Sequence, residues 1–367
     1  MNGARHLYVH LPFCASRCGY CDFVTAVGRT GEHGDYVDAL LAELALERRC
    51  LAPAVETVFV GGGTPTFAEP AALERLLRAL PRADELTVEA NPETVTPQLA
   101  RLLKRCGVTR VSLGAQSFDP RLLAVLDRAA TPDDVRTAFA TLRDAGFDNL
   151  SLDLIYGIPG QEPAGLAADL DAALALGPEH LSAYELEAKP GTRFTHAHGV
   201  ELERQADALE GYFETVVATL TGAGYRWYET ANFCRPDEGR DLRARHNLGY
   251  WRAEDFLGLG VGAVSTVGGR RWRNAPSLAL YAAALARGEA PPREHEELTA
   301  GVRLTERVML GLRLDEPLPL AGLDAALDRG ELDRMERAGL ASRANGSLAL
   351  TTRGRFLGGG VTARLLA

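Results

Sequence analysis

The stretch Cys14-Ala15-Ser16-Arg17-Cys18-Gly19-Tyr20-Cys21 places three thiols within eight residues, directly after the apolar run Leu7-Tyr8-Val9-His10-Leu11. Three cysteines on one short loop do not form a disulfide framework, and no secretory signal precedes them. A structural zinc site takes four protein ligands, often as two pairs, and no second pair follows. Cubane iron–sulfur sites are also usually closed by four cysteines. The trio therefore favours an iron–sulfur cluster with one iron open to a non-protein ligand, and a thiol-rich zinc loop is the alternative.

The composition is that of an ordinary globular protein. The chain has 367 residues, of which 46% are hydrophobic and 24% charged, and this length predicts about two domains. A net charge of −9 without a long basic run gives no reason to expect nucleic acid as a partner. No apolar run is as long as a membrane span, and no leader is recognised, so we expect a cytoplasmic protein. Cys50, Cys106 and Cys234 are scattered singly and are expected to be small apolar residues.

Strand-like and helix-like patterns alternate through the first half of the chain, which is typical of parallel βαβ units. Thr96-Pro97 and Thr131-Pro132 have the pattern of helix starts, and Gly107 and Gly146 that of helix ends. The predicted strands are His6 to His10, Thr57 to Val60, Leu86 to Glu89, Arg110 to Leu113, Leu150 to Ile155 and Leu181 to Leu186. We predict an α/β fold with a partly open, TIM-type (β/α)6 barrel, whose active site lies at the carboxyl ends of the strands.

Polar residues follow or end several of these strands. Gly61-Gly62-Gly63-Thr64-Pro65-Thr66 follows the second, and glycines let a backbone approach a ligand closely, although a tight turn is the alternative. Glu89, Gln116 and Asp153 lie in or after the next three strands. Carboxylates inside apolar strands are costly unless they are paired or bound. Arg128 could reach the carboxylate of a ligand. These side chains predict a site for a small polar molecule at the mouth of the barrel.

The spacing C-x3-C-x2-C resembles the cluster loop of the radical S-adenosylmethionine (SAM) enzymes. Beyond the superfamily, the chain resembles the oxygen-independent coproporphyrinogen III oxidase family over nearly its whole length, in the stretches Tyr8 to Cys14, Gly61 to Thr66, Gln116 to Phe118 and Asp153 to Gln161. The resemblance implies a [4Fe–4S] cluster on Cys14, Cys18 and Cys21, with SAM on the open iron. It also implies that SAM is contacted by Tyr8, Tyr20, Gly62, Gly63, Thr64, Glu89, Gln116, Arg128 and Asp153. One departure is Ala130, where relatives often carry a histidine.

Three features resemble the haem-chaperone branch of this family. The first feature is Phe23, because the porphyrinogen-oxidising branch typically has a fourth cysteine at this position, two residues after the third. The second is that the oxidising branch carries an N-terminal extension, whereas the cluster loop here begins at residue 14. The third feature is the stretch His246-Asn247-Leu248-Gly249-Tyr250-Trp251, which resembles the H-N-x-x-Y-W signature of the chaperones. The resemblance implies that His246, Tyr250 and Trp251 contact haem. An imidazole can ligate haem iron and aromatic rings offer flat apolar surface, but a packed aromatic corner is the alternative.

The implied function is therefore binding and delivery of haem as cargo. The resemblance implies a haem-acceptor protein and an electron donor as partners, and it assigns no catalytic residue. Two alternatives stay open at this point: an oxygen-independent coproporphyrinogen III oxidase of porphyrin biosynthesis, and a radical SAM enzyme with another substrate.

Three regions are predicted. Residues 1–190 form the radical SAM (β/α)6 core, residues 191–297 extend the barrel and carry the His246 to Trp251 motif, and residues 298–367 form a winged-helix-like α+β domain. Within the extension, Gly258 to Gly262 is predicted as a loop across the barrel mouth, because it lacks a dinucleotide-binding spacing. In the last region, Asn345-Gly346 is a strong hairpin-turn signal before the strand-like Leu348-Ala349-Leu350.

Overall fold

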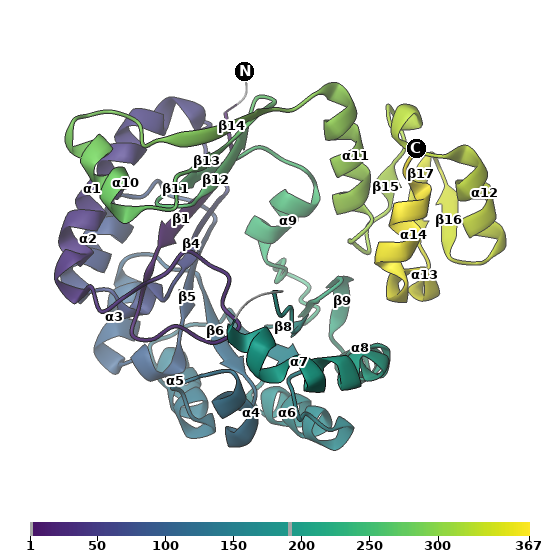
Figure 1. Ribbon diagram of the computed structural model, residues 1–367, viewed down its shortest axis with the longest axis horizontal. Helices are drawn as coiled ribbons and strands as arrows, with labels where there is room; N and C mark the ends of the chain where they lie inside the picture. The colour runs from purple at the N-terminus through teal and green to yellow at the C-terminus, as the bar shows by residue number, and fades with distance from the viewer. Residues whose placement is uncertain (1–2, 190–192) are drawn as a thin grey trace.

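The computed structural model describes residues 3–189 and 193–367. Its centre is a curved sheet of parallel strands with helices on the outside, joined at one side to a smaller C-terminal module (Figure 1). All six predicted strands are present and lie next to one another in chain order. They are β1 (His6–Leu11), β4 (Thr57–Gly62), β5 (Glu85–Ala90), β6 (Arg110–Gln116), β7 (Leu150–Tyr156) and β8 (His180–Glu185). The predicted α/β fold class is thus confirmed.

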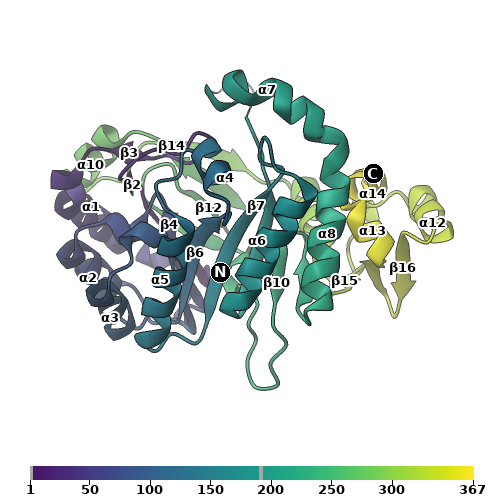
Figure 2. The same cartoon turned by 90° about the horizontal axis from the view of Figure 1, so that it is seen from below.

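Helices that follow these strands in the chain cover the outer face of the sheet (Figure 2). They are α1 (His33–Glu47), α2 (Pro70–Ala79), α3 (Pro97–Arg105), α4 (Pro120–Val125), α5 (Pro132–Asp144), α6 (Pro163–Leu176) and α8 (Leu209–Gly222), with α7 (Arg193–Gln205) near the barrel mouth. Two helix starts predicted from the sequence, at Thr96 and Thr131, are capped by the side chains of these residues. The Thr96 side chain accepts a hydrogen bond from the amide of Leu99, and Thr131 forms a capping box with Asp134.

Antiparallel strands extend the sheet at both sides. After β8 come β10 (Asn232–Cys234) and β9 (Arg226–Glu229), and beside β1 lie β11 (Phe256–Leu259), β12 (Val264–Val267), β13 (Arg270–Asn274) and β14 (Arg293–Glu297). The short helix α9 (Arg245–Trp251) connects the two sides, and α10 (Leu278–Ala286) packs near α1. A two-stranded pair, β2 (Phe13–Cys14) and β3 (Ala26–Val27), frames the cysteine loop.

The predicted loop over Gly258 to Gly262 is wrong in its first half. Gly258 lies in β11, which runs parallel to β1 and pairs with it at Tyr8. A Cβ atom on Gly258 would lie 2.1 Å from the carbonyl oxygen of Val264, so glycine is needed there for close packing within the sheet. The chain leaves the strand at Gly260, whose φ is 104°.

The C-terminal module has its own apolar core, formed by residues between Val308 and Leu365. It comprises α11 (Ala300–Gly311), β15 (Leu318–Pro319), α12 (Arg329–Arg337), β16 (Ala341–Ala344), β17 (Ser347–Leu350), α13 (Thr352–Phe356) and α14 (Gly358–Leu365). The predicted hairpin turn is present, because Asn345 and Gly346 both have positive φ, 50° and 73°, between antiparallel strands. The module has an apolar core of its own, and the predicted division of the chain at 190 and 297 stays a prediction.

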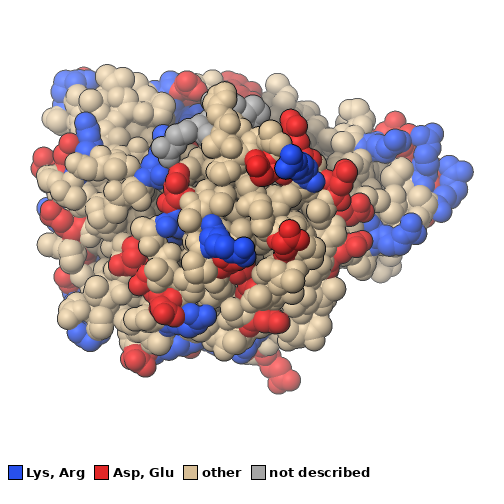
Figure 3. Space-filling view, turned by 60° about the horizontal axis from the view of Figure 1, so that its bottom comes forward, with Lys and Arg blue, Asp and Glu red and all other residues tan. Residues whose placement is uncertain are grey.

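The surface carries both signs of charge. Acidic and basic side chains are interspersed on the barrel, and basic ones are prominent on the C-terminal module at the right of Figure 3. Among the helices of the described residues, none is both long and apolar enough to cross a membrane.

Candidate functional site

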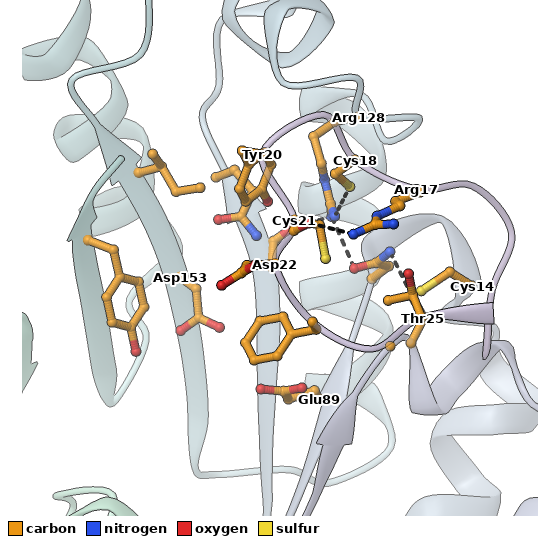
Figure 4. A pocket seen from close by; sticks show the side chains of 18 of the residues that line it. Cys14, Arg17, Cys18, Tyr20, Cys21, Asp22, Thr25, Glu89, Arg128 and Asp153 are labelled. Carbon is orange, nitrogen blue, oxygen red and sulfur yellow. Dashed lines mark hydrogen bonds between the residues drawn. The ribbon is translucent and has the colours of Figure 1, made fainter. Parts of the chain in front are cut away.

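A pocket of about 490 Å³ opens at the carboxyl ends of the parallel strands, and the three clustered cysteines lie on its wall (Figure 4). We call it the mouth pocket. Cys14 ends β2, while Cys18 and Cys21 lie on the loop that follows. The loop is anchored at both ends: the amide of Ala26 donates to the carbonyl of Pro12, and the amide of Gly19 donates to that of Leu126. The sequence thus places three thiols on a loop that the barrel holds over its mouth.

The thiols are spread around the pocket. Within the described residues, no three His, Cys, Asp or Glu side chains are gathered closely enough for a single metal ion. Three thiols line this one pocket, which is the donor number of a cluster with one open iron, whereas a structural zinc site takes four protein ligands. Burial raises the pKa of the Cys14 and Cys21 thiols, so cluster binding would release protons from them. The donor set therefore fits a cubane with one iron left to another ligand.

Arg128 ties the cysteine loop to the strands. Its Nη1 lies 3.5 Å from Cys18 Sγ, and its Nη2 donates to the carbonyl of Gly114 at 2.9 Å and to Asn91 Oδ1 at 3.1 Å. Its Nε is buried without a hydrogen-bond partner among the described residues. Buried polar atoms are rarely left unpaired, so this nitrogen is available to a polar ligand.

The glycines at the end of β4 and directly after it are required by close packing. A Cβ atom on Gly62 would lie 2.4 Å from the His10 ring, and one on Gly63 would lie 2.6 Å from the backbone of Pro12. Gly62 also has a φ of 110°, a conformation that side chains rarely tolerate. The run begins inside β4, and Gly62, Gly63 and Thr64 line the mouth pocket.

Two carboxylates stand on the floor of the pocket. Burial, reinforced by the charge of Asp153, raises the pKa of Glu89 to about 7, while a hydrogen bond from the amide of Gly62 at 3.0 Å opposes the shift. Burial also raises the pKa of Asp153, which accepts a hydrogen bond from Ser112 at 3.0 Å. These groups can accept hydrogen bonds from amine or hydroxyl groups of a small ligand.

An inner cavity of about 260 Å³ lies below the mouth pocket and shares Gly62, Glu89 and Asp153 with it. Tyr8 lines this inner cavity, where its hydroxyl lies 3.0 Å from His10 Nδ1. Tyr8 was predicted to contact SAM, and it lies in the inner cavity that adjoins the mouth pocket.

His246 is buried at the base of the inner cavity, with 1% of its surface exposed. Its Nδ1 is hydrogen-bonded to Thr57 Oγ1 at 2.8 Å and its Nε2 to the Tyr250 hydroxyl at 2.9 Å. Burial lowers the pKa of His246 to about 3, so the ring is neutral at physiological pH. With both ring nitrogens engaged, His246 has the geometry of the packed aromatic corner, the alternative that the sequence left open.

Trp251 lies apart from these two residues. It lines a different cavity with Pro317, and the Arg313 guanidinium stacks 4.4 Å from the centre of its ring. The structure therefore brings His246 and Tyr250 together but not Trp251.

The predicted residues divide into three places. The mouth pocket contains the three cysteines and Tyr20, Gly62, Gly63, Thr64, Glu89, Gln116, Arg128 and Asp153. The inner cavity contains Tyr8, His246 and Tyr250, and Trp251 lies elsewhere. Sequence reasoning did not single out Asn91, Ser112 or Tyr184, which also line the mouth pocket. The polar Ser112 within an apolar strand was the signal that could have identified one of them.

The fold and the cysteine loop define a radical SAM protein. Residues 8–173 match the Radical SAM superfamily, and residues 298–357 match the HemN C-terminal domain. Among solved structures, coproporphyrinogen III oxidase (HemN) from Escherichia coli is similar over 99% of this chain and 90% of its own, with a TM-score of 0.80 and 23% identity. This likeness shows the fold.

The chain belongs to the HemW family. It is 40% identical to "Heme chaperone HemW" of Mycobacterium tuberculosis (strain ATCC 25618 / H37Rv), over 98% of this chain and 94% of that protein. It is 34% identical to the protein of the same name in Bacillus subtilis (strain 168), over 83% of this chain and 82% of that protein. The predicted resemblance to the haem-chaperone branch is confirmed.

Proposed function

We propose that the chain is a cytoplasmic haem chaperone that holds a [4Fe–4S] cluster and SAM in the mouth pocket, binds haem as cargo, and delivers it to an acceptor protein. The observation that carries this proposal is the gathering of the three cysteines, the glycine run and Arg128 around one pocket in a HemW-family chain. We further propose residues 1–190, 191–297 and 298–367 as its core, extension and C-terminal domain.

In the mouth pocket, Cys14, Cys18 and Cys21 would hold the cluster. A reduced cluster with SAM supplies one-electron chemistry when both are bound. The chain's own residues bind and orient: Arg128 pairs with the carboxylate of SAM, and the backbone of the Gly62 to Thr64 turn contacts its methionine part. Glu89 and Asp153 accept hydrogen bonds from its amine or ribose groups. An electron-donor protein would have to reach this mouth, since the cysteine loop lies there (Figure 4).

Haem would bind at the His246 to Trp251 stretch, which lies far in sequence from the cysteines. Porphyrinogen oxidation is the weaker candidate, because Phe23 stands in place of the extra cysteine of the oxidising branch. Phe23 is 62% exposed and lines the mouth pocket, where it offers apolar surface and no further ligand.

The test combines a haem titration, a transfer assay and an oxidation assay on the full chain. Protein reconstituted anaerobically with iron and sulfide is titrated with haem and then mixed with a haem-depleted cytochrome b. Separate samples receive SAM, a reductant and coproporphyrinogen III. We expect about one haem per chain, transfer to the acceptor, and little or no protoporphyrinogen IX.

Two results would contradict the proposal. Failure of the wild-type chain to bind haem would reject the chaperone function. Sustained formation of protoporphyrinogen IX with release of methionine would place the chain in the oxidising branch. A Phe23→Leu variant serves as a matched control, because it keeps an apolar side chain at the pocket and should bind haem like the wild type.

A further inference from the structure

The helix α7 lies near the barrel mouth and packs on a small apolar group that is separate from the main core (Figure 2). We call this group the mouth core. Its buried members are Leu122, Leu126, Ile155, Ile158, Leu186 and Phe194, and Tyr20 and Leu202 pack against it half-buried. Phe194 and Leu202 belong to α7, whereas Tyr20 belongs to the cysteine loop. The mouth core therefore joins this helix to the loop.

The Phe194 ring lies directly against the cysteine loop at Gly19, the residue that follows Cys18. A Cβ atom on Gly19 would lie 3.0 Å from Phe194 Cδ2 and 2.8 Å from Asp127 Oδ2. Both distances are shorter than the usual separation of packed atoms, so the ring rests on the bare backbone of the loop. Phe194 thus covers the loop right beside one of the three thiols.

The two halves of the cysteine loop are held by different contacts. Cys14 lies in β2, which pairs with β3, and its Sγ accepts a hydrogen bond from Thr64 Oγ1 at 3.5 Å. In the second half, the amide of Gly19 donates to the carbonyl of Leu126 at 3.3 Å, which is long for such a bond. Leu126 is itself part of the mouth core with Phe194. Packing of Phe194 therefore positions both the backbone of this half and its acceptor.

Few contacts attach α7 to the barrel. Among its residues whose burial is described, Phe194 alone is buried, and Leu202, about two turns further along, is half-buried. At the far end, Gln205 Nε2 donates to the carbonyls of Ile158 and Gln161, each at 3.0 Å. Segments with few buried apolar contacts open locally while the rest of the fold stays intact. This helix can therefore leave the loop without unfolding the barrel.

We propose that α7 is a clasp on the cysteine loop, with Phe194 as the positioning residue for Cys18 and Cys21, and that its local opening controls access to an iron–sulfur cluster held there. The inference rests on the proposed cluster binding and adds the element that controls it. In the closed clasp, the Phe194 ring holds the loop at Gly19 against the barrel. In the open clasp, the second half of the loop is released, so that iron can be taken up or lost.

The first experiment measures amide hydrogen exchange by mass spectrometry on the metal-free full chain. Phe194→Ala should speed exchange at least about tenfold in peptides from α7 and from Arg17 to Asp22, and should leave peptides from β4 and α2 unchanged. Phe194→Leu should stay within about threefold of the wild type, because it keeps a large apolar side chain in the mouth core. Val200→Ala is the matched control, since Val200 lies on the same helix and is 57% exposed.

The second experiment measures how fast anaerobically reconstituted protein releases iron to excess EDTA, with each rate expressed relative to the iron bound at the start. Phe194→Ala should release iron at least about tenfold faster than the wild type. Gln205→Ala tests the clasp from its far end, about 16 Å along the helix axis from Phe194. It should release iron about two- to tenfold faster, because it removes two hydrogen bonds of the helix. Val200→Ala should match the wild type.

The outcomes separate the clasp from the proposed function. If the wild-type chain takes up no iron and sulfide, the proposed cluster fails, and the exchange data alone decide the clasp. Unchanged exchange of the loop in Phe194→Ala would overturn the clasp. Iron release at the wild-type rate in Gln205→Ala would also overturn it, since opening of the helix would then not control access. Circular dichroism establishes that each variant is folded, and if Phe194→Ala does not fold, Gln205→Ala carries both measurements.

Discussion

The Arg128 guanidinium lies 3.5 Å from Cys18 Sγ and at the same time donates to the carbonyl of Gly114, so it links the cysteine loop to the end of β6. Lysine cannot reproduce these contacts, because it lacks the planar fork of donors. We expect Arg128→Lys to keep the fold and to lower SAM affinity about 10- to 100-fold, as removal of outer contacts at metal sites does. Calorimetry on cluster-loaded protein measures the effect.

Arg121→Gln is the control for this change. Arg121 lies on α4, the short helix that ends just before Arg128, and its side chain is 86% exposed and pairs only with the nearby Asp119 among the described residues. If Arg128→Lys and wild-type protein bind SAM equally well, Arg128 holds the cysteine loop in place but does not contact SAM.

Each cysteine of the loop is expected to be indispensable. Replacing Cys14, Cys18 or Cys21 with Ala should abolish stable cluster assembly, because every thiolate binds a different iron. Iron and sulfide analysis after anaerobic reconstitution checks this, with Cys106→Ala as a control that should retain the full cluster. A wild-type preparation that binds zinc in a tetrahedral site but no iron and sulfide would instead support the zinc alternative.

Glu89 should make the ligand-free protein less stable as the pH rises. The folded state holds a proton on Glu89 up to pH about 7, whereas an unfolded glutamate releases it near pH 4.5, so the free energy of unfolding falls across this window. We expect a fall of about 3 kcal/mol that is absent in Glu89→Gln. Urea unfolding at several pH values measures it.

The exposed Glu93→Gln is the matched control and should keep the pH dependence of the wild type. In the presence of cluster and SAM, the ionised form of Glu89 is the hydrogen-bond acceptor, so SAM affinity should rise with pH through about 7. A SAM affinity that is constant from pH 6 to 8 would show that Glu89 does not contact SAM.

The hairpin turn of the C-terminal module should depend on its glycine. Gly346→Ala places a Cβ atom at a φ of 73° and should lower the free energy of unfolding of the full chain by about 1–2 kcal/mol. Gly360→Ala changes an exposed helical glycine in α14 with open space around it and should raise stability by up to about 1 kcal/mol. Urea unfolding measures both changes. A lower free energy of unfolding for Gly346→Ala with a higher one for Gly360→Ala would support the turn, and changes in the same direction would contradict it.

The parallel strands were predictable because each is a short, continuous apolar run between turn signals. Gly258 was not, since a glycine-rich stretch looks like a loop unless the neighbouring strand that requires it is known. In the structure, that neighbour is β12, whose Val264 oxygen leaves no room for a side chain at Gly258. Tertiary packing, rather than local preference, decides this strand.

The cysteine loop and the strand-end residues could be located from sequence because they share one mouth in any parallel barrel. The environment of His246 could not, because it is formed by residues distant in the chain. Thr57 lies 189 positions before His246, and His6 lies 51 positions before Thr57. The motif identified which residues to inspect. Only the folded structure shows that both ring nitrogens of His246 are hydrogen-bonded and that Tyr250 lines a second groove.

The open barrel has two edge strands, and each is prevented in a different way from pairing with another chain. On β14, Arg293 to Glu297 forms a row of charged and mostly exposed side chains, which disfavours further strand addition. On β9, the C-terminal module covers the edge: the amide of Asp315 donates to the carbonyl of Tyr228, and Arg355 donates to that of Trp227. Removal of the module would therefore leave β9 as an unprotected template for aggregation, with the Trp227 ring uncovered beside it.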